Sequence, residues 1–425
     1  METYINPGRE IWEELSKRPS SKNPVVEERV KAIIERVRTN GDEALRQLSL
    51  EIDRRELADI EVSAAEIEEA KARVSQEVKD AIAAAAKNIR VFHQAQMPRT
   101  IEVETAPGVR CIQKPVAIPR VGLYIPGGTA PLFSTVLMLA IPASLAGCSQ
   151  IILCTPTGKD GKVSAEVLYA ASFCGVQHIY KIGGAQAIAA MAHGTCTVPK
   201  VDKIFGPGNQ YVTTAKQLLA SSTVAIDMPA GPSEVMVISD ASSDPEFVAA
   251  DLLSQAEHGV DSQVMLVCDN AEFAERVSDA VVRQTEELSR ADLAKQALEK
   301  SRFVVFTREQ DIVDFANIYA PEHLIISTDD PWAITEQITS SGSVFVGKYT
   351  PESAGDYASG TNHTLPTCAW ARSFSGVNMD SFIRKMTIQE ISREGLDGLA
   401  GTIVAMAEAE GLQAHANAVK VRVKQ

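Results

Sequence analysis

The 425-residue sequence lacks the features of a membrane protein or of a disulfide-stabilised secreted protein. Its longest apolar run, Val136–Ala146, is interrupted by Pro142 and Ser144 and is too short to span a bilayer. The first residues, Met1–Arg9, contain no apolar stretch, so we expect no signal peptide. The seven cysteines include no C-x-x-C pair, which favours reduced thiols in a cytoplasmic protein.

An excess of positive charge is also missing. The chain has 41 Lys and Arg residues against 55 Asp and Glu residues, which leaves a formal net charge of −14. Such an acidic chain repels nucleic acids and anionic membranes, so we expect neither as a partner. We interpret the basic tail Lys420–Lys424 as a solvated helix end. The length exceeds that of one ordinary hydrophobic core, which predicts at least two large domains.

No complete nucleotide-binding fingerprint is present, neither G-x-G-x-x-G nor a P-loop. Two glycine-rich segments, Gly122–Gly128 and Phe205–Asn209, follow or interrupt predicted strands. Backbone N–H groups in such loops can bind a phosphate, particularly where a helix begins. On their own these segments are weak indications of a dinucleotide site.

The first hundred residues have the apolar spacing of helices, with a stop signal at Asn40-Gly41. A capping box at Ser63–Glu66 predicts a second helix that runs into the alanine-rich stretch Ala81–Ala86. From about Val116, short apolar runs bounded by glycine, proline or aspartate alternate with segments of helical length. The predicted strands form two sets of five: Val121–Ile125, Ile151–Cys154, His178–Ile182, Lys203–Phe205 and Val224–Ile226, then Val235–Ser239, Gln263–Cys268, Phe303–Phe306, His323–Ser327 and Val344–Val346.

This alternation is typical of parallel sheets covered by helices. We therefore predict an α/β protein with two incomplete Rossmann-like domains, at 116–232 and 233–375. Helical segments at 1–115 and 376–425 would flank them. The proline- and glycine-rich segment Asp227–Ser233 is the expected hinge. Because it lies between the two domains, we also expect it to form a wall of the cleft between them. Cys154 and Cys268 end apolar runs, so we interpret them as buried strand residues rather than nucleophiles.

Histidines are scarce, which makes their contexts informative. Four of the seven lie in polar, loop-prone segments beyond residue 250, whereas His93, His178 and His193 are interpreted as structural. Gln255 and His258 are three residues apart before Gly259, so they share a helix face that can hold a divalent cation. On its own the pattern is more typical of an ordinary helix C-terminus with a favourable histidine.

Three further segments combine histidine with carboxylates. Glu322-His323 follows Pro321 and forms a compact acid–base pair if the backbone lets the two side chains converge; on a regular strand they would face opposite ways. The glycine-rich loop Asp356–His363 is either an exposed polar loop or part of a site on an α/β frame. Glu410–His415 by itself is a helix near the C-terminus.

Taken together and in this order, these motifs resemble those of the histidinol dehydrogenase family across essentially the whole chain. The resemblance includes Asp227–Glu234 and both glycine-rich segments. It implies oxidation of L-histidinol through the aldehyde to L-histidine, the last step of histidine biosynthesis, with two NAD consumed. It also implies one zinc ion per subunit, bound at Gln255, His258, Asp356 and His415.

The resemblance implies roles for further residues. His323 would be the general base, and Glu322 would activate the water that hydrates the aldehyde. Positions that contact substrate in the family match Ser233, Gln255, His258, His323, Asp356, His363, Glu410 and His415; those that contact NAD match Tyr124, Gln186 and Asn209. The family forms homodimers in which residues 376–425 reach the partner, so Glu410 and His415 would complete the other subunit's site.

Two alternatives stay open. One is a related dehydrogenase that oxidises a different small amino alcohol or polyol at the same zinc site. The other is a non-catalytic metal- or nucleotide-binding protein with this fold, which the presence of both Glu322 and His323 disfavours. Turnover of histidinol compared with simple diols distinguishes these cases.

Overall fold

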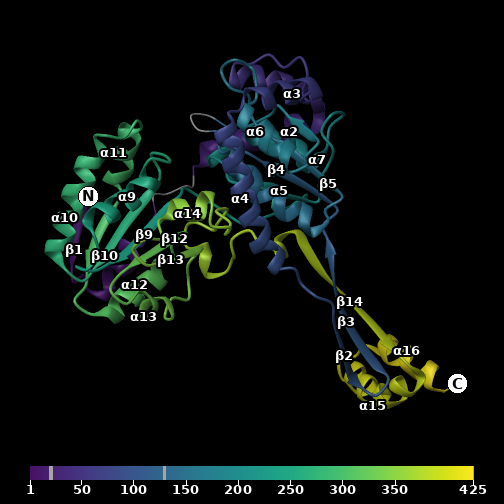
Figure 1. The fold of residues 1–425 in the computed structure, drawn as a ribbon. Coiled ribbons are helices and arrows are strands. Elements are labelled where there is room, and N and C mark those ends of the chain that lie inside the picture. Colours follow the sequence, from purple (N-terminus) through teal and green to yellow (C-terminus); the bar gives the residue numbers. More distant parts are fainter. Residues whose placement is uncertain (19–22, 128–130, 425) are drawn as a thin grey trace.

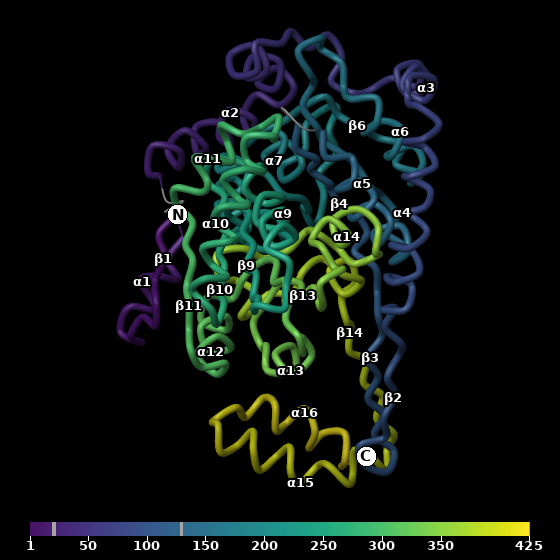
Figure 2. Tube along the Cα trace, turned by 60° about the vertical axis from the view of Figure 1, so that its left-hand side comes forward, coloured from purple at the N-terminus to yellow at the C-terminus, as the bar shows by residue number. Residues whose placement is uncertain are grey.

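The computed structural model describes residues 1–18, 23–127 and 131–424. It contains two helix-covered sheets and an arm that projects from one of them (Figures 1 and 2). All ten predicted strands are present, so the predicted α/β class with two parallel sheets is confirmed. Among the described residues, no helix combines the length and apolar character needed to cross a membrane.

The first sheet has five parallel strands in the order β6-β5-β4-β7-β8. Helices cover both of its faces. The core on one face includes residues of α3, α4, α5 and α6. The core on the other face includes residues of α2, α7 and α8. The strands are β4 (Arg120–Tyr124), β5 (Gln150–Cys154), β6 (His178–Tyr180), β7 (Lys203–Phe205) and β8 (Ala225–Ile226), and the helices are α2 (Pro24–Leu48), α3 (Ala64–Arg73), α4 (Gln76–Ala95), α5 (Phe133–Ala146), α6 (Ala165–Phe173), α7 (Gly184–His193) and α8 (Gln210–Ala220).

The second sheet has six parallel strands in the order β1-β11-β10-β9-β12-β13. Its side chains alternate between two cores, with Val235 and Val237 packed on one face and Met236 and Ile238 on the other. The strands are β1 (Glu2–Ile5), β9 (Glu234–Ser239), β10 (Gln263–Cys268), β11 (Arg302–Val305), β12 (His323–Ser327) and β13 (Ser343–Val346), and the helices are α1 (Trp12–Leu15), α9 (Pro245–Ala256), α10 (Ala271–Thr285), α11 (Ala291–Glu299), α12 (Glu309–Tyr319), α13 (Pro331–Thr335) and α14 (Glu352–Tyr357).

Numbered within each sheet, the predicted strands of both run in the spatial order 3-2-1-4-5. This is the order of a Rossmann fold without its sixth strand, as the prediction of incomplete domains requires. Cys154 and Cys268 are fully buried strand residues, as predicted, and all seven cysteines are free thiols.

The two flanking segments are not purely helical, which corrects the prediction. Residues 2–5 form β1, which pairs with β11 and covers what is otherwise an edge of the second sheet. Three longer strands form a separate antiparallel sheet: β2 (Ile101–Ala106), β3 (Val109–Ala117) and β14 (Ile383–Ile391). This sheet and the helices α15 (Arg393–Ala409) and α16 (Gln413–Val423) make up the projecting arm (Figures 1 and 2).

Two local predictions near the N-terminus are only partly right. The helical path does break at Gly41, which has φ +52° and ψ −129°, but a helix resumes directly and ends at Leu48. The capping box at Ser63–Glu66 forms as predicted. Its helix ends at Arg73, however, because Ser75 caps a new helix that contains the alanine-rich stretch.

Buried ion pairs anchor both ends of the expected hinge, 227–233. At its start, the carboxylate of Asp227 lies 2.5 Å from Lys216 Nζ and accepts a hydrogen bond from Gly206 N. Just beyond its end, Glu234 forms a two-pronged pair with Arg18, with N–O distances of 2.6 and 2.9 Å. The pair Lys216–Asp227 belongs to the first sheet unit and the pair Arg18–Glu234 to the second. Each end of the connecting segment is therefore fixed to the unit that it adjoins.

We expect Arg18→Met to lower the free energy of unfolding by about 3–5 kcal/mol, because Glu234 is 1% exposed and would be left as an unpaired buried charge. Urea denaturation followed by circular dichroism measures this loss. The matched control is Arg36→Met, which removes the exposed pair with Glu51 and should cost at most about 1 kcal/mol. Equal small losses in both variants would contradict the expectation.

Candidate functional site

The candidate catalytic pair lies at the amino end of β12. His323 is the first residue of this strand and lies beside Val235 of β9 and Ser343 of β13. Before the strand, Ala320 adopts φ +50° and Pro321 follows, which ends α12 with a sharp turn. Because Glu322 lies in this turn and not in the strand, the two side chains converge, with Glu322 Oε2 3.6 Å from His323 Nδ1.

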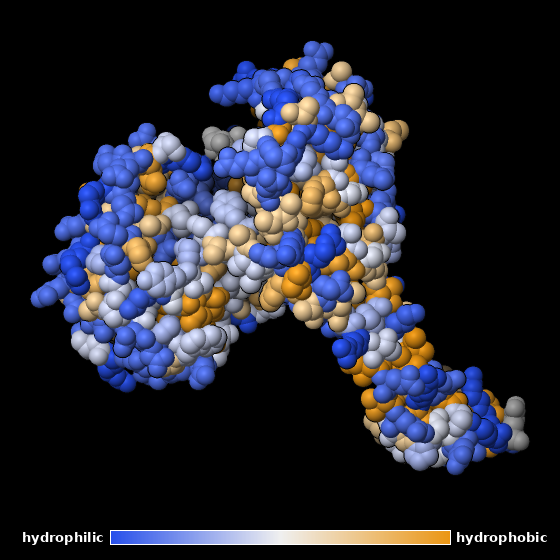
Figure 3. All heavy atoms as spheres, viewed as in Figure 1, coloured by the Kyte–Doolittle hydropathy of each residue, from blue (hydrophilic) through white to orange (hydrophobic). Residues whose placement is uncertain are grey.

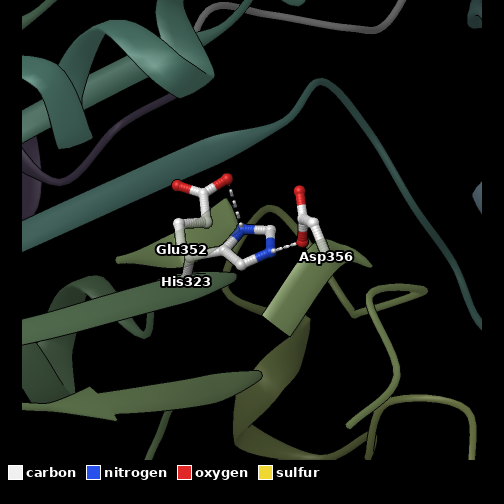
Figure 4. A group of neighbouring side chains, drawn as sticks. All are labelled: His323, Glu352 and Asp356. Atoms are coloured by element: carbon white, nitrogen blue, oxygen red, sulfur yellow. Dashed lines mark ion pairs between the residues drawn. The ribbon is translucent and has the colours of Figure 1, made fainter. Parts of the chain in front are cut away.

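A short helix supplies two carboxylates on either side of the imidazole. Glu352 and Asp356 are four residues apart on α14 and therefore share a face. Glu352 Oε1 lies 3.9 Å from His323 Nδ1, and Asp356 Oδ1 lies 3.5 Å from Nε2 (Figure 4). One ring nitrogen and one oxygen from each carboxylate all lie within 4.8 Å of one another.

Helix α9 brings Gln255 to the same point. Its Nε2 donates a hydrogen bond to Glu352 Oε1 at 2.9 Å and lies 3.0 Å from His323 Nδ1. His258 lies one turn further along, beyond the helix end, with an exposed side chain. Desolvation nevertheless lowers the pKa of its imidazole, and the nearby charge of Asp356 opposes this shift.

The site holds more buried carboxylates than positive charge. Burial raises the pKa values of Glu322 and Glu352 to about 8, against the opposing effect of His323. Burial alone would lower the pKa of His323, but the surrounding carboxylates Glu352, Glu322 and Asp356 raise it to about 10. One imidazolium therefore faces three carboxyl groups, an arrangement that favours an added cation.

The donor atoms fit a metal ion. Within the described part of the chain, four buried atoms here have no hydrogen-bond partner: Gln255 Oε1, His323 Nε2, Glu352 Oε2 and Asp356 Oδ1. Unpaired buried oxygen and nitrogen atoms cost free energy unless something binds them. Oxygen and imidazole donors of this kind suit Zn²⁺, among other divalent ions. Of the four predicted metal ligands, this structure brings Gln255 and Asp356 together, with His258 at the edge.

The predicted substrate residues Ser233 and His363 lie around this centre. Ser233 is half-buried and directly precedes Glu234, whose N–H donates to Glu322 Oε2 at 2.9 Å. His363 Nε2 lies 3.5 Å from the hydroxyl of Thr135 on α5. The loop after α14 therefore touches the first sheet unit. Burial lowers the pKa of His363, and the charge of Asp356 opposes this shift.

The three predicted NAD contacts lie at the carboxyl edge of the first sheet. Tyr124 ends β4, and its hydroxyl accepts a hydrogen bond from Gly184 N. Gln186 is buried in the first turn of α7, where Nε2 donates to Asp53 Oδ2 at 3.3 Å. Asn209 caps α8. Strands β4 and β7 are where the strand order reverses, the usual place for a nucleotide in this fold.

The loop between β7 and α8 packs so closely on β4 that it needs glycine. Gly206 has φ +122°, and a Cβ there would lie 2.1 Å from the carbonyl oxygen of Tyr124. In the other glycine-rich segment, Gly128 lies outside the described residues.

Glu410 and His415 are not part of this cluster within one chain. Both are exposed on the arm, where Glu410 ends α15 and His415 lies in α16. The arm points away from the sheet units in both views (Figures 1 and 2).

Comparison with known proteins agrees with the order of these motifs. The family model described as "Histidinol dehydrogenase" matches residues 16–423. The chain belongs to this family. A curated histidinol dehydrogenase of Bacteroides fragilis (strain YCH46) is 54% identical over 419 residues, covering 99% of this chain and 98% of the relative. That of Escherichia coli (strain K12) is 54% identical over 396 residues, covering 93% and 90%.

A solved structure extends the similarity to the fold. The crystal structure of histidinol dehydrogenase from Elizabethkingia anophelis is 50% identical, with a TM-score of 0.97, and the match covers 100% of this chain and 98% of that chain. Members of the histidinol dehydrogenase family are NAD-dependent oxidoreductases that act on an alcohol, and this chain is one of them.

Two carboxylates near this site were not predicted from the sequence. Glu352 precedes the glycine-rich loop segment, and its signal is the spacing to Asp356 four residues later. Asp251 lies one turn before Gln255 on α9, and burial raises its pKa to about 7. Neither residue has a histidine as its neighbour in sequence, so neither stands out as part of a motif.

We expect Gly355→Ala to lower dehydrogenase activity by about tenfold or more, because α14 packs closely on β13. The new Cβ would lie 2.6 Å from Cε1 of the buried Phe345 ring and would displace Glu352 and Asp356. Initial rates of NADH formation measure the effect. The double variant Gly355→Ala/Phe345→Leu restores space and should recover part of the activity; no recovery would contradict this account.

Proposed function

We propose that this protein oxidises L-histidinol to L-histidine through L-histidinaldehyde, using two NAD per substrate and one zinc ion per subunit, as the last step of histidine biosynthesis. Family membership supports the reaction. The observation that carries the proposal is the convergence of Glu322 and His323 with Gln255 and Asp356 at one buried, carboxylate-rich point.

In the proposed site, Gln255, His258 and Asp356 hold the zinc ion together with His415 of the partner subunit. The unpaired oxygens of Gln255 and Asp356 support this set. When bound, zinc would orient the substrate's imidazole and amine and polarise the reacting centre. Its charge also compensates the buried carboxylates, so His323 can be neutral, as a general base must be.

His323 is proposed to accept the proton of the alcohol while hydride passes to the nicotinamide of NAD, which produces the aldehyde and NADH. Glu322 then takes a proton from water as that water adds to the aldehyde, and protonated His323 returns its proton to the alkoxide that forms. This gives the hydrated diol and leaves His323 neutral again. His323 accepts a proton from the diol as the second hydride leaves, and the carboxylic acid results. The backbone N–H of Glu234 fixes Glu322 for this role.

NAD is proposed to bind at the carboxyl edge of the first sheet, near Tyr124, Gln186 and Asn209. The contact between Thr135 and His363 supports hydride transfer between the units, because it brings the loop of the catalytic unit against the first one. The lack of a complete dinucleotide fingerprint favours weak, exchangeable binding, which suits a reaction that uses two NAD in turn. Ser233 and His363 are proposed to bind the substrate.

We further propose a homodimer in which the arm, within 376–425, places Glu410 and His415 in the partner's site. The arm has an apolar surface that the rest of its own chain does not cover (Figure 3). Burial of such a surface by a second copy would stabilise the pair. Its exposed apolar residues are Ile101, Val103, Met386, Ile388, Ile391, Met406, Leu412 and Val421.

The division into domains at 116–232 and 233–375 is likewise a proposal, supported by the two separate sheets and the anchored segment between them. The cytoplasmic location stays a prediction from the cysteine pattern.

The direct test is NADH formation at 340 nm with L-histidinol, counted against substrate consumed. We expect two NADH per histidinol, loss of activity after removal of the metal by a chelator, and recovery when zinc is added. A folded, zinc-loaded protein that forms no NADH from histidinol, but oxidises another amino alcohol or diol, would replace this proposal with the related dehydrogenase.

Sharing of the site between subunits has its own test. His323→Ala and His415→Ala should each lose nearly all activity in both oxidation steps. Mixed dimers of the two variants should recover up to about half the wild-type activity per dimer, since one of the two sites then has neither change. Mixed dimers that form, as shown by differently tagged subunits, but stay inactive would rule out a shared site.

A further inference from the structure

Glu352 is a buried carboxylate to which the proposed reaction gives no role. It is 1% exposed, at the start of α14, and one oxygen, Oε2, has no hydrogen-bond partner within the described residues. The nearest positive group is His323, whose Nδ1 is 3.9 Å from Oε1. A carboxylate buried with so few compensating contacts destabilises the fold, which indicates that it serves the site and not stability.

The Glu352 carboxylate accepts a hydrogen bond from a proposed metal ligand. Gln255 Nε2 donates to Glu352 Oε1 at 2.9 Å and lies 3.0 Å from His323 Nδ1. One hydrogen of the amide is thus directed at Glu352, while the donor in the contact with His323 Nδ1 depends on the imidazole tautomer. The remaining atom, Gln255 Oε1, is buried and unpaired.

Orientation decides whether a glutamine can bind a cation. A side-chain amide presents either its oxygen, which has lone pairs, or its NH₂ group, which has only donors. The two orientations have nearly the same shape, so packing alone does not select one. A carboxylate accepts hydrogen bonds and repels an amide oxygen, so Glu352 selects the orientation in which NH₂ faces it.

We propose that Glu352 is a positioning residue that holds the Gln255 amide with its oxygen toward the metal. This inference rests on the proposed role of Gln255 as a ligand. Helix α14 then serves the centre twice, through Asp356 directly and through Glu352 by way of Gln255. Partners that orient a ligand in this way typically change metal affinity about 10–100-fold when removed.

The test is a double-mutant cycle on zinc affinity, measured by competition with a chromophoric chelator on metal-free protein. Glu352→Met removes the acceptor and should weaken zinc binding about 10–100-fold. Gln255→Ala should weaken it to a similar extent. The double variant should bind no more weakly than Gln255→Ala, because Glu352 acts through that residue.

Two further variants complete the set. Glu352→Gln keeps an acceptor oxygen at this position and should lose clearly less affinity than Glu352→Met. The control Glu336→Gln removes an exposed carboxylate of the same unit and should bind zinc like wild type. The thermal midpoint of metal-free Glu352→Met should equal or exceed that of metal-free wild type. If Glu352 had only a structural role, the substitution would lower this midpoint. With Co²⁺ in place of zinc, the visible spectrum of Glu352→Met should differ from that of wild type in the same way as the spectrum of Gln255→Ala does.

Two results would overturn the inference. One is zinc affinity of Glu352→Met within twofold of wild type while Gln255→Ala is impaired. The other is additive losses in the double variant, which would make Glu352 a ligand in its own right. If Gln255→Ala instead bound zinc as tightly as wild type, the proposed ligand set would be refuted. If the wild-type protein bound zinc but did not oxidise histidinol, the proposed reaction would be refuted, and the double-mutant cycle on zinc affinity would stay valid.

Discussion

The buried ion pair between Arg18 and Glu234 connects four segments of the second sheet unit. The carboxylate of Glu234 binds Arg18 and the backbone N–H of Cys368, while its own backbone N–H holds Glu322. Arg18 in turn lies 3.5 Å above the ring of Tyr319, at the end of α12. One buried pair thus links the N-terminal segment, the start of β9, the turn before β12 and the loop that contains Cys368.

Charge balance explains why the site is built around a single imidazole. His323 is almost completely buried among Glu322, Glu352 and Asp356, and water cannot screen their repulsion there. The imidazole compensates only part of this negative charge. Such a cluster of buried carboxylates lowers the stability of the folded protein. Natural proteins keep clusters of this kind chiefly at functional sites. Burial raises the pKa values of Glu322 and Glu352, and the neighbouring carboxylates add to this shift.

The two sheet units use opposite ends of similar sheets. The predicted NAD contacts lie at the carboxyl edge of the first sheet, as expected for this strand order. The candidate catalytic residues instead lie at the amino ends of β9 and β12 in the second sheet. Helix α14 carries Asp356, and the loop after it reaches the first unit through His363, so one segment serves both the centre and the contact between units.

By itself, the sequence determined what depends on neighbours along the chain. All ten strands of the parallel sheets, the break at Gly41 and the cap at Ser63 follow from local periodicity and local hydrogen bonds. The chemically distinctive residues were also visible, because histidines are few and their motifs resemble a known family.

Tertiary structure decided what depends on distant partners. Strand β1 exists because β11 offers an edge 300 residues away, and β2, β3 and β14 form because they pair with one another. Glu352 acquires its place only because α14 packs against β13 and α9, and its bond to Gln255 spans 97 residues. No local pattern encodes such contacts, since they are stabilised by packing and burial that exist only once the sheets have formed.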